Sequence, residues 1–184
     1  GYNGAPPNCD FFFEDVHVPA DAMVGGDGEG FAIAMKCMEF NRPAMSASAL
    51  GIAQGALEQA VAFAKEREQF GKPIADFQLI QAMIADSEAE CIAARAMVEQ
   101  TARQMDAGEN VTKAAAACKY FASETAWRIA DRAVQVHGGY GYMRETAVER
   151  LFRDARLLRI FEGTSQVMQL VIARETLKEY RAAH

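Results

Sequence analysis

The stretch from Phe31 to Glu66 decides the fold and reads FAIAMKCMEFNRPAMSASALGIAQGALEQAVAFAKE. Most of its residues are apolar or small and its charges are few, which predicts one long and largely buried helix. At about 1.5 Å per residue such a helix would be roughly 50 Å long. Pro43 should kink it, because proline removes one backbone hydrogen bond. The pattern is broken at Gly71-Lys72-Pro73.

Two more long helices are expected after this break. The second helix runs from about Asp76 to Asp106, and apolar residues at helical spacing form its core stripe: Ile80, Ile84, Cys91, Ala94 and Val98. Gly108 is a plausible stop for this helix. Asn110 can cap the third helix, over about 111–136, and the residues at its centre, 114–121, are small enough for close packing.

The last part of the chain predicts shorter helices. A glycine-rich loop, 137–142, is followed by a short amphipathic helix, and Phe161-Glu162-Gly163 is another break. Thr164 or Ser165 then caps a final helix to about Tyr180. Long helices joined by short turns predict an all-α fold, an antiparallel four-helix bundle.

The N-terminal segment differs from the rest. Aromatic and β-branched residues from Phe11 to Val18, ended by Pro19, predict one strand. Because a strand needs ladder partners, this segment either pairs with sequence outside this chain or lies loosely on the surface. We therefore expect residues 1–26 to be the end of a β-domain and its linker, and residues 27–184 to be the helical bundle domain. The chain begins without Met, and we expect a fragment of a longer protein.

Composition excludes several classes of function. Among 184 residues, 51 % are hydrophobic and 24 % charged, and the net charge is −6. An acidic domain is a poor partner for nucleic acid. No apolar run approaches the roughly 20 residues of a membrane span, and no spacing typical of metal ligands occurs. The four cysteines are expected to be free, mostly buried thiols of a reducing compartment.

Several motifs together resemble the acyl-CoA dehydrogenase family, most closely its straight-chain, medium-chain type enzymes. The matching stretches are Phe13 to Val16 with Val18-Pro19, Gly28-Glu29-Gly30, Arg42, Arg67 to Ile74, Phe77-Gln78, Gln135 to Gly139, Arg153 to Arg156, and Phe161 to Gln166. Each alone is weak, but their order and spacing are specific. Subunits of this family have three parts: an N-terminal helical domain, a β-domain and a C-terminal four-helix bundle. The resemblance implies that this chain corresponds to the last strand of the β-domain and the whole of the bundle.

The resemblance implies α,β-dehydrogenation of acyl-CoA thioesters, in which a base takes the α-proton and N5 of FAD takes the β-hydride. Glu162 matches the base, and Gly163 lets the substrate approach the backbone closely. Read without the resemblance, Glu162 is merely a solvated loop glutamate. Isovaleryl-type and long-chain-type relatives carry a base just before the arginine that matches Arg42, where this chain has Asn41. Nitroalkane oxidases have Asp at the Glu162 position.

Other matches imply substrate contacts. Arg42 matches an arginine beside the thioester pocket that helps to fix the loop carrying the base, although an ordinary helix-surface arginine is an equal alternative before the resemblance. Glu39 matches a position that touches the CoA portion. Arg174, on the last helix, matches an arginine that contacts CoA, and arginine suits phosphate.

The family's FAD site is assembled across a dimer interface, and eight residues match it. Arg67 matches the partner of the FAD pyrophosphate, Phe70 an aromatic on the adenine side, and Gln78 a polar contact nearby. The remaining matches are a loop that reaches the FAD of the partner subunit and contacts to flavin and adenosine: Gln135, Gly138 and Gly139, and Thr164 and Gln166. Without the resemblance, the glycine loop is a plain turn.

The resemblance also implies partners: acyl-CoA as substrate, electron-transfer flavoprotein as electron acceptor, and self-association as a homodimer or homotetramer. We expect a bacterial cytoplasm, or the mitochondrial matrix in a eukaryote, with no membrane or nucleic-acid partner. Two alternatives remain open. One is an acyl-CoA oxidase or flavin monooxygenase on the same fold, and the other is a non-catalytic helical assembly domain.

Overall fold

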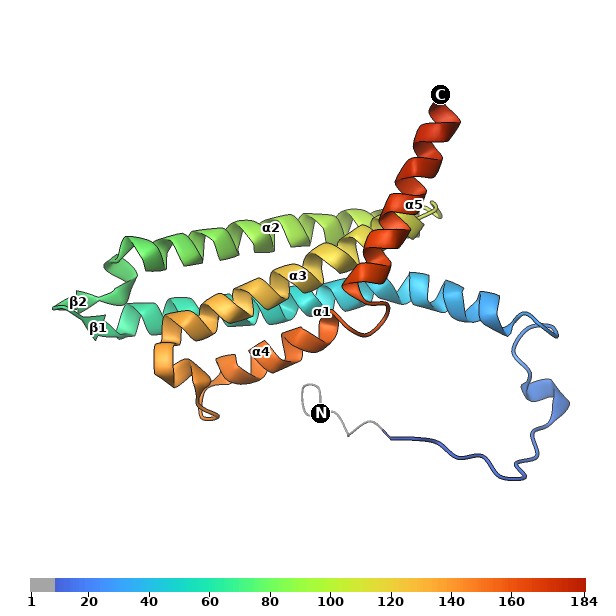
Figure 1. Cartoon of the computed structure of the whole chain (residues 1–184), viewed down its shortest axis with the longest axis horizontal. Coiled ribbons are helices and arrows are strands. Elements are labelled where there is room, and N and C mark those ends of the chain that lie inside the picture. The colour runs from blue at the N-terminus through green and yellow to red at the C-terminus, as the bar shows by residue number, and fades with distance from the viewer. Residues whose placement is uncertain (1–8) are drawn as a thin grey trace.

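The computed structural model describes residues 9–184, in which five α-helices account for most of the chain. The helices are α1 (Gly30–Glu66), α2 (Gln78–Asp106), α3 (Thr112–His137), α4 (Ala147–Leu158) and α5 (Ser165–Ala183). Figure 1 shows α1 to α4 running in alternating directions, as in an antiparallel bundle, while α5 leaves the bundle at a steep angle. The predicted all-α fold class is confirmed.

Alanine dominates the core between α1 and the helices packed on it. Ala53 and Ala56 of α1 and Ala126 and Ala130 of α3 are fully buried. Because the side chain of alanine is a single methyl group, the backbones of α1 and α3 can lie close together. The core between them is therefore stabilised mainly by close packing of small side chains. Ile129 of α3 is among the few large apolar side chains that are fully buried in it.

Short elements connect the long helices. Strands β1 (Glu68–Gln69) and β2 (Lys72–Pro73) form a small antiparallel hairpin, and the 3-10 helix η3 (Ile74–Asp76) follows. The second helix begins at Gln78 rather than at the predicted Asp76, because Phe77 is extended at φ −97° and ψ 130°. The 3-10 helix η4 (Gly138–Tyr142) forms the glycine-rich loop before α4.

The helix ends otherwise follow the predicted signals closely. The predicted first helix, 31–66, is observed as Gly30–Glu66 and continues through Pro43. Asn110 accepts a hydrogen bond from the Thr112 amide at 3.0 Å, so its side chain stabilises the start of α3, although the N-cap residue itself is Val111, one residue later than predicted. Thr164 caps α5, with its hydroxyl accepting from the Val167 amide at 3.2 Å.

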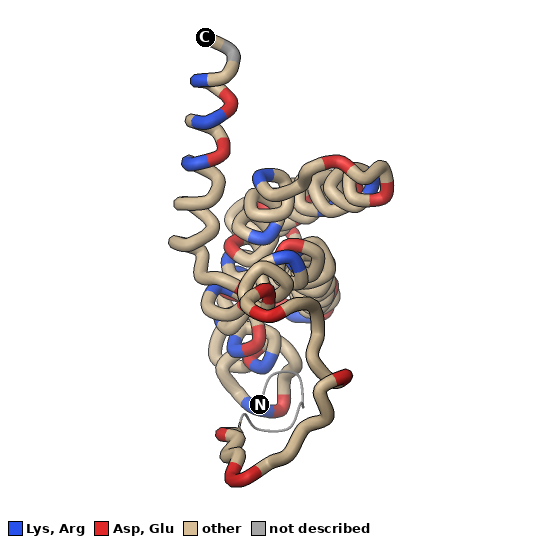
Figure 2. Tube along the Cα trace, turned by 90° about the vertical axis from the view of Figure 1, so that its right-hand side faces the viewer, with Lys and Arg blue, Asp and Glu red and all other residues tan. Residues whose placement is uncertain are grey.

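The predicted strand at Phe11–Val18 is wrong for this structure. Residues 9–19 form no strand, and Phe11, Phe12 and Phe13 are 78 %, 85 % and 79 % exposed. Figure 2 shows the segment before α1 standing away from the packed helices. A single strand is unstable because its backbone groups need hydrogen-bond partners on a neighbouring strand, and this segment has no such partner among the described residues.

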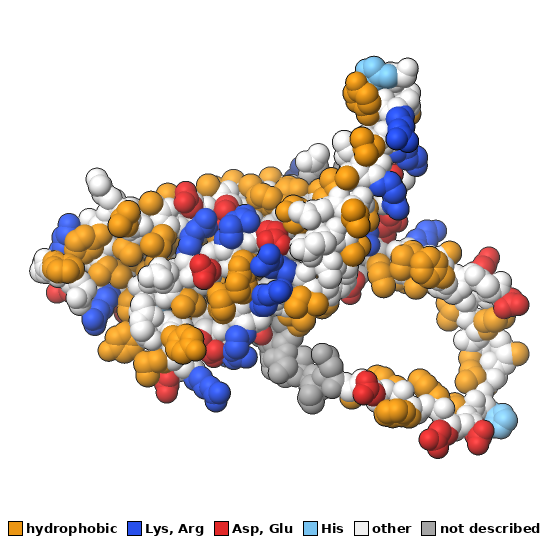
Figure 3. Space-filling model, viewed as in Figure 1, with side chains coloured by type: hydrophobic (Ala, Val, Ile, Leu, Met, Phe, Trp, Pro, Cys, Tyr) orange, Lys and Arg blue, Asp and Glu red, His pale blue; other side chains and the backbone are white. Residues whose placement is uncertain are grey.

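The exposed apolar surface continues from this segment onto the first turns of α1. Phe31 and Phe40 are 76 % and 74 % exposed, and Met35 and Met38 are more than a third exposed. Figure 3 shows hydrophobic side chains along both parts. Patches of this size on a folded domain mark surfaces that bind something.

The four cysteines are free, as predicted, but only two are buried. Cys9 and Cys37 are exposed, whereas Cys91 and Cys118 lie in the core. Burial raises the pKa of the Cys91 and Cys118 thiols, which keeps them protonated and unreactive. Among the helices of the described part of the chain, none combines the length and the apolar character needed to cross a membrane.

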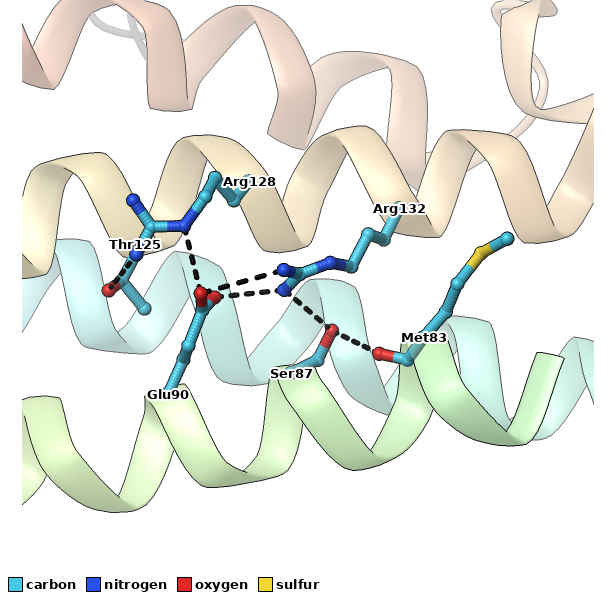
Figure 4. Close-up of polar contacts among 6 residues, drawn as sticks. All are labelled: Met83, Ser87, Glu90, Thr125, Arg128 and Arg132. Atoms are coloured by element: carbon cyan, nitrogen blue, oxygen red, sulfur yellow. Dashed lines mark hydrogen bonds and ion pairs between the residues drawn. The ribbon is translucent and has the colours of Figure 1, made fainter. Parts of the chain in front are cut away.

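One carboxylate joins α2 to α3. Arg128 donates from Nε to Oε1 of Glu90 at 2.8 Å, and Arg132 donates from Nη1 to Oε2 at 2.9 Å (Figure 4). Ser87 accepts from Arg132 at 3.4 Å and donates to the Met83 carbonyl at 2.7 Å. Since both carboxylate oxygens are used, the network fixes how α2 is aligned along α3.

We expect Glu90→Ala to lower the free energy of unfolding of this chain by roughly 1–3 kcal/mol, because it leaves two partly buried guanidinium groups without their acceptor. The matched control is Glu99→Ala, also in α2, which removes one exposed pair with Arg103 and should change stability by less than about 0.5 kcal/mol. Urea unfolding of the three proteins measures both effects. Equal losses in the two variants would contradict a bridging role for Glu90.

Candidate active site

The turn between α4 and α5 has a strained backbone. Glu162 has φ +55° and Gly163 has φ +88°, so two consecutive residues lie in the left-handed region. That region is unfavourable for a residue with a Cβ, and a glutamate there persists only where its surroundings hold it. The turn is closed by a hydrogen bond from the Ser165 amide to the Arg159 carbonyl at 3.1 Å.

Gly163 is required by both conformation and space. A Cβ at this position would lie 2.6 Å from Cε of Met168, a fully buried side chain in the first turn of α5. The methionine could shift, but the positive φ would remain unfavourable for any other residue. The sequence Glu162-Gly163 therefore fixes the direction in which the chain enters α5.

The Glu162 carboxylate is half-buried and is held by α1. Asn41 donates from Nδ2 to its Oε1 at 2.9 Å across 121 residues of sequence. The two side chains lie at one end of a largely apolar cleft of about 650 Å³, whose other lining residues all come from α1: Ile33, Lys36, Cys37, Met38 and Phe40. A carboxylate at the wall of an apolar cleft is suited to general base chemistry.

Arg42, the residue after Asn41, is buried at 8 % exposure. The alternative that it is an ordinary helix-surface arginine is therefore wrong. Its Nε is buried and makes no hydrogen bond to any atom of residues 9–184. A buried donor without an acceptor is uncommon in folded proteins.

Lys119 of α3 lies beneath the turn. It is 2 % exposed, and its Nζ donates to the Gly163 carbonyl at 2.6 Å. Burial, and next the positive charge of Arg42, lower the pKa of Lys119 to about 8, against the opposing effect of the Glu162 and Glu124 carboxylates. The turn is thus bonded to α3 through its backbone and to α1 through the Glu162 side chain.

A second residue of α3 holds both flanks of the turn. Oε1 of Glu124 accepts from Nε of Arg159 at 2.8 Å and from the hydroxyl of Ser165 at 2.6 Å. Arg159 directly follows α4, and Ser165 begins α5. Since one carboxylate oxygen binds both sides, the ends of the turn are held together over α3.

The residues predicted to bind the cofactor fall into two groups. Six of them lie near the hairpin end of the bundle, away from the turn between α4 and α5 (Figure 1). One cleft there, of about 640 Å³, is lined by Arg67, Gly138 and Gly139, and a second, of about 680 Å³, by Phe70 and Gln78. Gln69 and Ile74 line both clefts, so the two adjoin. Gln135 is exposed in the last turn of α3.

This end of the bundle has the features of an open binding surface. The Arg67 guanidinium lies 5.8 Å from the centre of the Tyr140 ring, and Phe70 is 94 % exposed with φ +53°. Gly138 has φ +58° and is exposed, so its backbone is accessible to a ligand. An exposed cation, an exposed aromatic ring and accessible glycine amides suit a ligand with a diphosphate and a planar group.

The remaining predicted residues are near the turn or on α5. Thr164 and Gln166 flank the start of α5, and Gln166 is exposed. Glu39 is half-buried in α1, two residues before Asn41. Arg174 is exposed on the part of α5 that leaves the bundle and pairs with Glu175 at 2.9 Å. The described residues of this single chain do not bring Arg174 into the cleft beside Glu162.

Sequence reasoning missed Lys119. The centre of the third helix was expected to contain small residues, yet Lys119 is among the largest fully buried side chains of the protein. A signal was present: residues three and four positions away on either side, Ala115, Ala116, Ala122 and Ser123, lie on one helix face, and all are buried. A lysine in the middle of such a face needs a specific partner.

The fold and this site together define a helical domain that presents a glutamate, on a strained turn, to an apolar cleft. The family described as "Acyl-CoA dehydrogenase, C-terminal domain" matches residues 28–177. The chain therefore belongs to the acyl-CoA dehydrogenase family.

Comparison with individual proteins supports membership of this family. Cyclohexane-1-carbonyl-CoA dehydrogenase of Geobacter metallireducens is 47 % identical, and the caffeyl-CoA reductase-Etf complex subunit CarC of Acetobacterium woodii is 48 % identical; each match covers 92 % of this chain and 45 % of the relative. The structure of butyryl-CoA dehydrogenase from Megasphaera elsdenii superimposes with a TM-score of 0.88 at 44 % identity, over 90 % of this chain and 43 % of that one. The chain thus spans less than half the length of these relatives.

We expect Gly163→Ala to destabilise this chain by about 1 kcal/mol or more, because alanine must adopt the positive φ of the turn. Gly51→Ala is the control, since Gly51 lies inside α1, where an added Cβ meets no atom within 4 Å, and alanine there should stabilise by roughly 0.5–1 kcal/mol. Thermal unfolding gives both values. The interpretation of the turn would be refuted by a Gly163→Ala protein that is as stable as the Gly51→Ala protein.

The lowered pKa of Lys119 predicts a pH dependence of stability. The lysine has an ordinary pKa of 10.5 when unfolded and about 8 when folded, so between these values the unfolded chain binds more protons. The free energy of unfolding, taken relative to that of a Lys119→Met protein, should therefore rise by roughly 1–3 kcal/mol as the pH increases from about 8 to 10.5. Unfolding of both proteins across this range measures the difference, in which the titration of cysteines cancels. A constant difference would show that Lys119 titrates normally.

Proposed function

We propose that the protein containing this chain is an FAD-dependent acyl-CoA dehydrogenase in which Glu162 takes the α-proton of an acyl-CoA thioester. The observation that carries the proposal is the half-buried carboxylate of Glu162, held by Asn41 at the wall of an apolar cleft. The two relatives named above are both named after CoA thioesters, which supports this substrate class.

Each residue of the site has a role in this proposal. Asn41 fixes the carboxylate through Oε1 and leaves Oε2 for the proton of the substrate. The apolar wall of the cleft excludes water from an acyl chain, which strengthens the electrostatic contacts inside. Arg42, which directly follows Asn41 and is buried, is proposed to lie beside the thioester and to help fix the turn that carries Glu162. Glu39 and Arg174 are proposed to contact the CoA portion.

The proton and the electrons balance. Glu162 receives H⁺ from the α-carbon, the electron pair left behind forms the double bond, and the β-carbon loses a hydride. FAD, when bound, supplies the acceptor for that hydride at N5. The residues at the hairpin end fit this cofactor, because Arg67 suits the diphosphate, Phe70 suits a planar ring, and Gly138 and Gly139 expose their backbone. Gln78 and Gln135 are proposed as polar contacts.

The separation of the two cofactor groups supports a site shared between two copies of the chain. Thr164 and Gln166 lie beside the base, whereas Arg67 and the glycine loop lie near the hairpin (Figure 1). We therefore propose that one copy supplies the first group and a second copy supplies the other, in a homodimer or homotetramer. Residues 1–26 are proposed to belong to the β-domain of a longer chain.

Electron-transfer flavoprotein is proposed as the electron acceptor, since one relative is named as a subunit of a reductase-Etf complex. A bacterial cytoplasm is the proposed location, on the basis of the bacterial relatives.

The test uses the full-length protein reconstituted with FAD and mixed without oxygen with butyryl-CoA, longer straight-chain acyl-CoAs and cyclohexane-1-carbonyl-CoA. We expect flavin absorbance to bleach with at least one thioester, and Glu162→Gln to lower the bleaching rate by at least about 100-fold, because it removes the base. Glu58→Gln, an exposed glutamate of α1, is the matched control and should keep the wild-type rate.

The outcomes discriminate between functions. Equal bleaching in wild type and Glu162→Gln would assign the base to another residue. Bound FAD that no thioester bleaches would favour the assembly-domain alternative. Oxygen consumption during turnover would favour the oxidase or monooxygenase.

A further inference from the structure

The turn that carries Glu162 is bonded to α3 at three atoms by two buried or partly buried side chains. Lys119 Nζ bonds to the Gly163 carbonyl at 2.6 Å, and Glu124 binds Arg159 and Ser165 on the two flanks. Lys119 and Glu124 are five residues apart on one helix, so their spacing is fixed by the helix itself. We call this arrangement the α3 clamp, consisting of Lys119, Glu124 and their three bonds.

Filling space does not explain a lysine at this position. Lys119 is 2 % exposed, and its neighbours on the same face are alanine and serine. Burying an ammonium group is unfavourable unless it is bonded, and methionine would fill a similar volume without that penalty. The carbonyl it binds belongs to the residue directly after Glu162.

We propose that Lys119 is a positioning residue for Glu162, acting through the Gly163 carbonyl, with Glu124 holding the flanks of the same turn. The inference rests on the proposed role of Glu162 as the base. It assigns to α3 a part in catalysis although α3 contributes no residue to the lining of the Glu162 cleft.

The strained backbone explains why such a residue is needed. Glu162 at φ +55° would relax toward negative φ if the turn were free, and its carboxylate would then leave the cleft. The bond to the Gly163 carbonyl restrains the next peptide plane, between Gly163 and Thr164, so a change of φ at Glu162 would have to be compensated within one residue or would break that bond. A displacement of about 1 Å at a reacting group can reduce a rate about 100-fold.

The Lys119 ammonium is also part of a group of charges at the turn. The charged groups around it are Arg42 from α1, Glu162 from the turn, and Glu124 from α3, itself paired with Arg159. Replacing Lys119 by a neutral residue would therefore remove a positive charge from beside two carboxylates as well as the bond to the turn.

The experiment compares Lys119→Met with Lys113→Met in the full-length flavoprotein. Lys113 lies on the same helix and pairs with Glu179 of α5, so its replacement removes one charge and one ion pair without touching the turn. Two quantities are measured: the rate of anaerobic flavin reduction by acyl-CoA as a function of substrate concentration, and the amide hydrogen exchange of residues 159–168.

We expect Lys119→Met to lower the limiting rate of flavin reduction about 10- to 100-fold, with little change in the half-saturating concentration, because binding contacts are kept while the base is misplaced. Amides of the turn should exchange faster, while Lys113→Met should match wild type in the limiting rate, the half-saturating concentration and the amide exchange. Ser165→Ala, which removes only one bond of the α3 clamp, should lower the limiting rate and speed the exchange of the turn to a smaller extent. This milder variant still tests the inference if Lys119→Met does not fold.

Two results would overturn the inference. One is a Lys119→Met protein with the wild-type limiting rate of flavin reduction, and the other is unchanged exchange of the turn in both Lys119→Met and Ser165→Ala. Failure of the proposed function is recognised separately, because it leaves wild-type flavin unreduced by every thioester. The exchange measurement needs no activity and still decides whether the α3 clamp holds the turn.

Discussion

The close contact between α1 and α3 is the constraint on which the site depends. Alanines at the contact, fully buried on both helices, allow the two backbones to approach closely. Asn41 of α1 and Lys119 of α3 can then reach the same turn, at 2.9 Å and 2.6 Å. A larger residue in this contact would move the two anchors apart, and the strained turn would lose one of them.

Side chains of both charges lie close together around the turn. Arg42 and Lys119 are buried cations, and the carboxylates of Glu162 and Glu124 lie near them. Burial, and next the positive charge of Arg42, lower the pKa of Lys119 to about 8. The cost of burying this lysine is therefore only partly offset by the two carboxylates, and its bond to the Gly163 carbonyl is what the buried ammonium supplies to the turn.

The sequence was most informative where a pattern is local. The bounds of α1, the Asn110 cap and the Thr164 cap follow from apolar content and from capping residues, and all agree with the structure within a residue or two. The turn at Glu162 could be placed as a break, but its bond to Asn41 spans 121 residues and depends on how the helices pack. The strand at Phe11–Val18 failed for the opposite reason: its local pattern is strong, but ladder partners are not local.

The resemblance to a family pointed to residues that the single chain does not bring together. Arg67 and Phe70 precede and join the strands of the hairpin, while Thr164 and Gln166 follow Glu162 at the start of α5, and Figure 1 shows these two places far apart along the bundle. A site divided in this way is incomplete in one copy, which fits the exposure of Phe70 at 94 % and Leu79 at 78 % on adjoining elements. Apolar residues so exposed are unfavourable in water, and their burial against a second copy would stabilise the assembly. On the function proposed here, assembly and cofactor binding are therefore coupled, because the surface that a second copy covers is the one that completes the flavin site.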